Sequence, residues 1–191
     1  MTEYNLGHLA IEGLVTELSV AAGQPIVFLI DESHGHAAST QQNIANVDQL
    51  LEHADVRLIG VESHHVDDVG MGDQCSDVVD PTFANQFNGH EHADVAGVES
   101  AELFGVMNDD TVEMPVGEIA VYPMNYLRSY YFLMALFRHR RRRGLGGNMV
   151  LNAGRNHIDH IRQLVAWGGA HQLAGTAASY IHIRATAFPA E

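Results

Sequence analysis

The histidines of this chain gather beside glutamates in short polar clusters. One cluster holds Glu32 and His34, and a second holds Glu62, His64 and His65. Histidine is the commonest protein ligand of metal ions and an acid or base near neutral pH. A carboxylate beside it can orient the ring and stabilise the imidazolium form. The two clusters therefore predict either acid–base chemistry or a bound divalent metal ion.

Each cluster directly follows a short apolar run, which is typical of a strand buried on both faces. Residues 26–30 (Ile-Val-Phe-Leu-Ile) precede the first cluster, and residues 56–61 precede the second. Between these runs, Ser39 or Thr40 is expected to cap an amphipathic helix. Strand, helix and strand in this order form a βαβ unit whose strands are parallel. Ligand sites in such sheets lie beyond the carboxyl ends of the strands, where both clusters are expected.

A third strand is expected at residues 148–153, and it leads into a Gly-x-x-His segment that ends at His157. If this strand belongs to the same sheet, His157 meets the first two clusters in one cleft. Three clusters at successive strand ends predict a functional site more strongly than one cluster does. His64 and His65 are the weaker candidates within it, because neighbours along an extended strand point to opposite faces.

Two blocks of the sequence also resemble a known superfamily. The block from 26 to 62 has the order apolar strand, Glu-Ser-His-Gly, amphipathic helix, apolar strand, Glu, and the block 149–157 ends in Gly-Arg-Asn-His. Together they resemble the superfamily that unites erythromycin esterases, ChaN-like haem-binding lipoproteins and the TraB/Tiki proteins. The resemblance implies an α/β fold with paired glutamates and two Gly-x-x-His motifs lining one pocket. Asp31 stands where the first motif has glycine.

By position, the resemblance implies site roles for four residues, namely Glu32, His34, Glu62 and His157. Arginine and tyrosine side chains also occur in such pockets. Arg155, Arg128 and Tyr126 are therefore candidates for binding an anionic substrate group.

The order of these elements predicts a single domain over residues 1–191, with an α/β fold and a mainly parallel β-sheet flanked by helices. Residues 66–96 are rich in aspartate and glycine, and we expect a mobile acidic insertion over the mouth of the site, partly helical around 82–87. The other expected elements are helices at about 4–20, at 99–106, from Pro123 and after His157, and a final strand at 179–185.

Composition and charge exclude several classes of protein. The formal net charge is −14 and all ten basic residues are arginines, so no nucleic-acid partner is expected. The longest apolar stretches are too short to span a bilayer, so no membrane partner is expected either. The single cysteine, Cys75, cannot form an internal disulfide, and the N-terminus lacks the features of a signal peptide. The cytoplasm is therefore the expected compartment, and a homo-oligomer is left open.

The leading functional hypothesis is a hydrolase that acts on an ester or amide bond of a small molecule or peptide. Water would be activated by His34 or by a metal ion, a second histidine would protonate the leaving group, and Arg155 would stabilise the oxyanion. The expected catalytic residues are Glu32, His34, Glu62, His157 and Arg155. The expected metal ligands are Glu32, His34, Glu62 and His157, with His64 and His65 as weaker candidates.

Two alternatives use the same residues differently. The first is a non-catalytic protein that binds haem or a metal ion, so the cofactor is left open between a divalent metal and haem. The second is a partner-binding protein with a vestigial pocket. Outside the clusters, the arginine run 138–143 is interpreted as a solvated helix end and His90–His92 as a solvated loop. An acidic loop around Cys75 would raise the pKa of its thiol, so a nucleophilic role is not expected.

Overall fold

The fold is built on one five-stranded sheet. A computed structural model describes residues 15–19, 25–67, 69–75, 81–108 and 118–173. The strands are β1 (Val15–Ser19), β2 (Ile26–Glu32), β3 (Val56–His65), β4 (Asp94–Glu99) and β5 (Asn148–Gly154), in the order β1-β2-β5-β3-β4. Only β1 is antiparallel to its neighbour, so the mainly parallel sheet expected from the sequence is confirmed.

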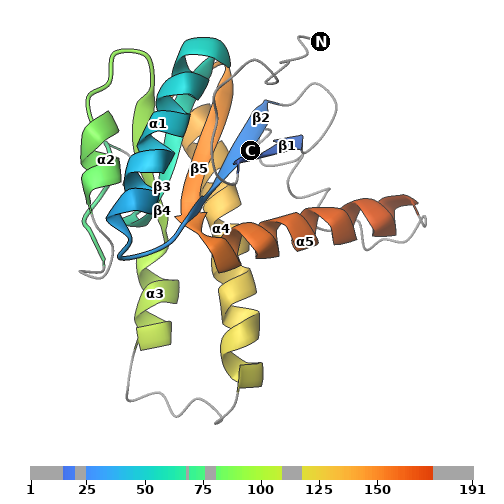
Figure 1. The fold of residues 1–191 in the computed structure, drawn as a ribbon. Helices are drawn as coiled ribbons and strands as arrows, with labels where there is room; N and C mark the ends of the chain where they lie inside the picture. The colour runs from blue at the N-terminus through green and yellow to red at the C-terminus, as the bar shows by residue number, and fades with distance from the viewer. Residues whose placement is uncertain (1–14, 20–24, 68, 76–80, 109–117, 174–191) are drawn as a thin grey trace.

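Helices cover both faces of this sheet, as Figure 1 shows. The helices are α1 (Ala37–His53), α2 (Thr82–Phe87), α3 (Ala101–Asn108), α4 (Glu118–Arg142) and α5 (Arg155–Leu173). α1 and α2 pack on one face, and α4 and α5 pack on the other. The result is a three-layer α/β/α arrangement, which confirms the predicted fold class.

The two faces of β2 explain why its sequence is continuously apolar. Val27 and Leu29 pack against the side of the sheet that α4 covers, whereas Phe28 and Ile30 pack against α1. All four side chains are completely buried. Burial on both faces removes the alternation of polar and apolar residues that a half-exposed strand would show.

The position of β5 determines how the carboxyl edge of the sheet is assembled. β5 lies between β2 and β3, so these two strands are parallel but are not hydrogen-bonded neighbours. In the register, Asn152 pairs with Ile30 on one side and with Val61 on the other, and Gly154 pairs with Glu32. The polar residues of β5 therefore lie between the clusters that follow β2 and β3.

The helix predicted over about 4–20 is wrong where the structure describes it. Val15–Ser19 form β1, which pairs with the edge of β2, for example Thr16 with Leu29. Pairing with an existing strand overrode a leucine spacing that resembles a helical period. Residues 4–14 and 20 of that prediction, and the strand predicted at 179–185, lie outside the described residues.

The acidic insertion predicted around 66–96 extends too far. Its last residues belong to β4, a parallel strand over Asp94–Glu99, and the helix expected from Glu99 begins at Ala101. Val95, Ala96 and Val98 of β4 are buried. The helix expected around 82–87 is present as α2.

Two helix ends complete the comparison with the sequence. α1 begins at Ala37 with His36 at its N-cap and no capping side chain, so the cap expected at Ser39 or Thr40 is wrong. Arg140, Arg141 and Arg142 lie in the last turn of α4, where the helix dipole favours cations, as predicted. Arg143 follows the helix and pairs with Asp94 at 3.2 Å. No helix within the described residues is long and apolar enough to cross a membrane.

Candidate active site at the carboxyl edge of the sheet

Three parallel strands end in buried glutamates. Glu32 ends β2, Glu62 lies near the end of β3, and Glu99 ends β4. Their exposed fractions are 6%, 6% and 0%. In Figure 1 the carboxyl ends of these strands lie at the lower edge of the sheet, where α5 and α3 begin. Buried carboxylates need hydrogen-bonding or charged partners, and the neighbouring elements supply them.

Glu32 is held between β5 and the loop that follows its own strand. Asn152 donates a hydrogen bond from Nδ2 to Glu32 Oε2 at 2.5 Å, and Asn43 of α1 donates in turn to Asn152 Oδ1 at 3.1 Å. Glu32 Oε1 lies 3.5 Å from His34 Nδ1. This chain of contacts orients the carboxylate, which then orients the imidazole.

Glu62 is the point at which the other groups meet. Gly154 donates its backbone N–H to Glu62 Oε2 at 2.5 Å. Glu62 Oε1 lies 3.4 Å from His157 Nε2, 3.9 Å from His34 Nε2 and 3.7 Å from Arg128 Nη2. A Cβ at Gly154 would stand 2.9 Å from His34 Nε2, so a side chain at this position would push the His34 ring away from Glu62. Burial raises the pKa of Glu62, and the Gly154 N–H, His34 and Arg128 oppose that rise.

Glu99 and Arg128 are the residues that the sequence analysis missed or left unplaced. Arg128 of α4 donates to Glu99 from Nε at 3.0 Å and from Nη2 at 2.6 Å, which is a bidentate pair. Glu99 was not a candidate because the first residues of its strand were assigned to the insertion and Glu99 itself to the start of a helix. The available signal was the repeat of one pattern, an apolar run that ends in glutamate, at Glu32, Glu62 and Glu99.

The two histidines at the site differ in their electrostatics. The hydrogen bond to Glu32 raises the pKa of His34 above its ordinary value, although partial burial opposes this. Burial lowers the pKa of His157 to about 3, and the positive charge of Arg128 contributes. The His34 side chain is 34% exposed, whereas that of His157 is 9% exposed. His34 is therefore the histidine that solvent reaches.

The structure places the weaker candidates His64 and His65 differently from those two histidines. Ser63 has a positive φ of 64°, so the chain is not extended here and the simple alternation of faces does not apply. His64 is buried, and its Nδ1 lies 3.4 Å from the carbonyl oxygen of Glu62 rather than from its carboxylate. His65 Nε2 is a buried atom for which the described residues provide no hydrogen-bond partner.

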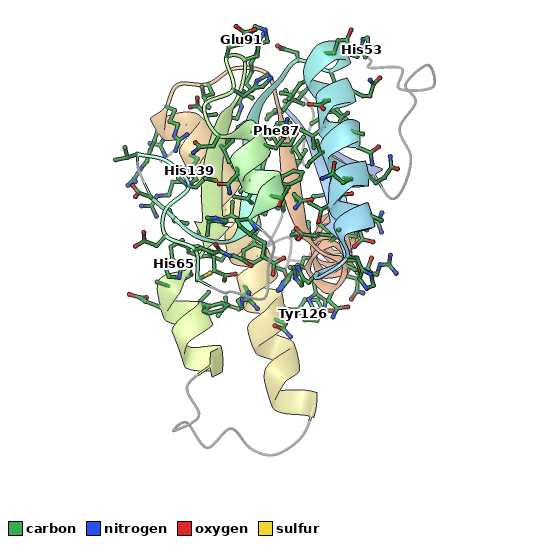
Figure 2. All side chains as sticks on the ribbon, turned by 60° about the vertical axis from the view of Figure 1, so that its left-hand side comes forward. His53, His65, Phe87, Glu91, Tyr126 and His139 are labelled. Carbon is green, nitrogen blue, oxygen red and sulfur yellow. The ribbon has the colours of Figure 1, made fainter. Side chains whose placement is uncertain are left out.

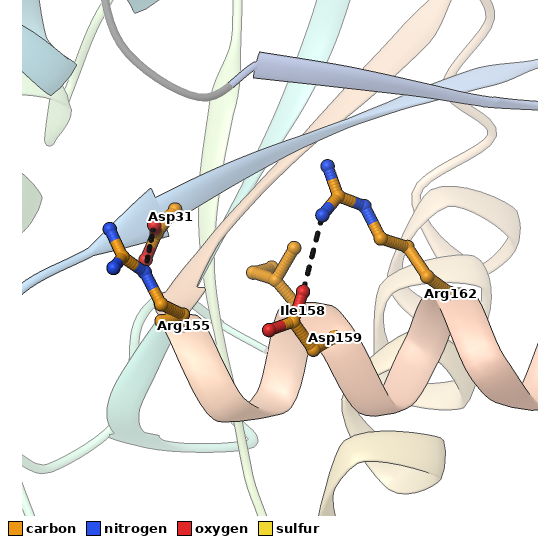
Figure 3. A pocket seen from close by; sticks show the side chains of 5 residues that line it. All are labelled: Asp31, Arg155, Ile158, Asp159 and Arg162. Atoms are coloured by element: carbon orange, nitrogen blue, oxygen red, sulfur yellow. Dashed lines mark hydrogen bonds and ion pairs between the residues drawn. The ribbon is translucent and has the colours of Figure 1, made fainter.

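Arg155 lies at the rim of the site and not among the buried glutamates. Its Nε donates to Asp31 Oδ2 at 2.7 Å, and its side chain is 66% exposed. Figure 3 shows this pair at a hollow of about 160 Å³, with Ile158, Asp159 and Arg162 as the other lining residues. Arg128, rather than Arg155, is therefore the arginine that contacts Glu62.

The remaining predicted groups lie elsewhere or take supporting positions. Glu91, which lies between His90 and His92, is at the end of the molecule opposite Tyr126 and His65 in Figure 2. His92 pairs with Glu91 at 3.0 Å, and both are exposed, in keeping with a solvated loop. Tyr126 stacks on His160, with ring centroids 4.0 Å apart.

Burial raises the pKa of the Cys75 thiol to about 11, with Glu99 adding to the effect. An unreactive thiol was predicted, although burial rather than the acidic loop is the main cause. A thiolate is the nucleophilic form of cysteine, so Cys75 is almost entirely protonated at neutral pH.

The four expected metal ligands contact one another in alternating His–Glu pairs, at 3.4 to 3.9 Å. Within the described part of the chain, no group of three or more His, Cys, Asp or Glu side chains is arranged to hold a metal ion. One oxygen of Glu32 and one oxygen of Glu62 already accept hydrogen bonds, from Asn152 and Gly154. A metal-ligating role for these residues stays a prediction.

Comparison with known proteins does not assign the chain to a family. No family model matches the sequence, and no curated protein or solved structure does so either. The resemblance to the erythromycin esterase, ChaN-like and TraB/Tiki superfamily therefore stays a prediction that depends on the two sequence blocks.

Proposed function

We propose that the residues around Glu62 catalyse the hydrolysis of an ester or amide bond by general acid–base chemistry. The observation that carries this proposal is the placement of His34. Its Nδ1 faces Glu32 at 3.5 Å, its Nε2 faces Glu62 at 3.9 Å, and about a third of its side chain is open to solvent. A base must reach both water and substrate, and His34 is the exposed member of the cluster.

In this mechanism His34 takes a proton from the attacking water. Glu32 accepts from the Nδ1–H of His34, which leaves the Nε2 lone pair to receive that proton. The carboxylate also stabilises the imidazolium that forms, which agrees with the raised pKa of His34. Asn152 holds Glu32 in place for this purpose.

Glu62 is the group best suited to protonate the leaving group. Burial raises its pKa, so it retains a proton at higher pH than an ordinary glutamate. From the sequence, a second histidine is expected to perform this step. With its pKa at about 3, His157 is neutral near pH 7 and has no imidazolium proton to donate. Arg128, whose Nη2 lies 3.7 Å from Glu62, supplies positive charge for the developing oxyanion.

A panel of small esters and peptide amides tests the proposal with the purified chain. His34→Ala is expected to lower kcat/KM by about a hundredfold or more, as removal of a general base does. The matched control is His36→Ala, because His36 lies two residues away and its side chain does not cap α1. Turnover that is unchanged in His34→Ala would overturn the mechanism.

The binding alternative makes a different prediction for the same preparations. A Soret band on adding haem, or a metal ion retained through gel filtration, would favour it if no substrate in the panel were turned over.

The substrate is proposed to be a small molecule or peptide. The cytoplasm is proposed as the compartment, because the single cysteine cannot form an internal disulfide.

A further inference from the structure

A buried serine of α4 connects two histidines of α5. Ser129 is 0% exposed, and its hydroxyl oxygen has three polar neighbours. It donates a hydrogen bond to the carbonyl oxygen of Asn125 at 2.6 Å. It also lies 2.8 Å from His157 Nδ1 and 3.3 Å from His160 Nδ1. Three polar contacts are as many as a hydroxyl can satisfy.

The number of protons available decides the direction of these contacts. A hydroxyl group has one proton and two lone pairs. Since the Ser129 proton goes to Asn125, both lone pairs remain to accept from the two imidazoles. His157, whose Nδ1 lies 2.8 Å from the hydroxyl oxygen, must then carry its proton on Nδ1. The more distant His160 also hydrogen-bonds to the carbonyl oxygen of Asn125. Burial lowers the pKa of both histidines, so near pH 7 each ring is neutral and has a single N–H.

We propose that Ser129 is a positioning residue that holds His157 in the Nδ1–H form, with the Nε2 lone pair directed at Glu62. His157 Nε2 lies 3.4 Å from Glu62 Oε1. An imidazole with the opposite proton placement would present an N–H to this carboxyl group and would favour its ionised form. With a lone pair there, His157 is an acceptor for the proton of a neutral carboxyl group.

The packing around His157 supports a fixed ring. The Phe132 ring lies against it, with centroids 4.8 Å apart, and His160 approaches it edge-on at 6.3 Å. Tyr126 stacks on His160, the second histidine next to Ser129, and the Tyr126 hydroxyl donates a hydrogen bond to Gln163. The ring is therefore held by aromatic neighbours and by Ser129, which leaves Glu62 as the polar group on its Nε2 side.

This arrangement gives Ser129 an indirect part in the reaction. Because Ser129 is completely buried, it is placed to act on Glu62 through His157 rather than on a substrate directly. The link to turnover rests on the proposed function, because it supposes that Glu62 donates the proton to the leaving group. The proton placement on His157 does not depend on any reaction, so it can be tested separately.

The primary test is a long-range proton–nitrogen NMR spectrum of the unmodified chain labelled with ¹⁵N-histidine. Such spectra distinguish the two neutral forms of imidazole by the shifts of their two nitrogens. The signals of His157 are assigned as those lost in His157→Gln. The expected result at pH 7 is a protonated Nδ1 and an unprotonated Nε2. An Nε2–H form of His157 in the unmodified chain would overturn the proposal.

Variants extend the test to the role of the hydroxyl group. Ser129→Ala is expected to remove the preference for Nδ1–H at His157 and to lower kcat at least about tenfold with KM unchanged. Ser129→Thr keeps a hydroxyl and is expected to restore both readouts in part. Ser39→Ala is the control for the His157 spectrum only, since the Ser39 hydroxyl accepts from the backbone of Ser33, next to His34, and is not a neighbour of His157 in the described contacts. An unaltered His157 spectrum in Ser129→Ala would contradict the positioning role.

The two proposals can fail independently. If no ester or amide is hydrolysed but the Nδ1–H form is present and is lost in Ser129→Ala, the positioning role stands and the proposed function falls. If hydrolysis depends on His34 while His157 has the Nε2–H form, the function stands and the role of Ser129 falls.

Discussion

Glu99 and Arg128 form a bidentate ion pair that is almost completely removed from solvent. The side chain of Glu99 is 0% exposed and that of Arg128 is 9% exposed. The rings of Phe104 and Phe132 lie 5.5 and 5.7 Å from the guanidinium carbon of Arg128. Each charge is therefore stabilised mainly by the other, and the carboxyl group of Glu62 lies 3.7 Å from Arg128 as a second acidic neighbour of the guanidinium group.

Removing one partner of this pair should be strongly destabilising. Arg128→Met leaves the Glu99 carboxylate buried without its counter-charge, and we expect the free energy of unfolding to fall by about 3–5 kcal/mol. Urea denaturation measures this loss. The exposed pair Asp55 and Arg57, 2.7 Å apart, is the control, and Arg57→Met should cost less than about 1 kcal/mol. Equal losses at the two sites would contradict this account.

Position 97 of β4 should accept only glycine, because the backbone at His65 and Met71 passes directly over it. A Cβ there would stand 2.0 Å from the carbonyl oxygen of Met71 and 2.3 Å from that of His65. These are backbone atoms, so Gly97→Ala forces the chain to move, and we expect a loss of about 1–3 kcal/mol in urea denaturation. At the helical Gly105 nothing lies within 4 Å, and alanine should be neutral or stabilise by up to about 1 kcal/mol. Similar effects at both positions would contradict the steric argument.

The pKa of His34 should depend on Glu32. The hydrogen bond from His34 Nδ1 is the largest cause that raises this pKa, so Glu32→Gln is expected to lower it. Glutamine has nearly the same size and still offers an oxygen to Asn152, which makes the change mainly electrostatic. An NMR titration of the His34 ring protons measures the shift. Glu52→Gln at the far end of α1 is the control, and a His34 pKa unchanged by Glu32→Gln would refute the prediction.

The buried His157 should make the chain less stable as the pH falls. Its pKa is about 3 in the folded chain and about 6.5 in the unfolded one, so between these values the unfolded chain binds the extra proton. The contribution is fully present above pH 6.5 and is lost at about 1.4 kcal/mol per pH unit below it. Between pH 7 and pH 5, urea denaturation should therefore show about 2 kcal/mol more loss for the unmodified chain than for His157→Gln. A difference that does not change with pH would count against the prediction.

The sequence predicts the central strands because burial on both faces requires an uninterrupted apolar run, which is visible in the sequence itself. The run 26–30 had to be continuously apolar once α1 and α4 covered both of its sides, and residues 149–151 of β5 follow the same rule. Polar residues at the ends of such runs could then be placed at one edge of a parallel sheet. For this reason Glu32, His34, Glu62 and His157 were expected together, and the structure does bring them together.

The features that were missed depend on contacts between distant segments. β4 contains alanine and glycine, which favour strands weakly, and its pairing with β3 is what makes it a strand. β1 exists because the edge of β2 accepts it. The choice of Arg128 over Arg155 depends on how α4 packs against the sheet, which no local pattern of residues encodes.

The place of β5 in the sheet also has a consequence during biosynthesis. β5 is the last strand along the described chain, yet it lies in the middle of the sheet and supplies Asn152 and Gly154 to the two glutamates beside it. A nascent chain leaves the ribosome N-terminus first, so β2 and β3 emerge long before the strand that separates them. Until β5 is made, the edges of β2 and β3 that face it lack their hydrogen-bonding partner. The carboxylates of Glu32 and Glu62 also lack the hydrogen bonds that Asn152 and Gly154 donate. Translation must pass residue 154 before this cluster of buried glutamates and its hydrogen bonds can form.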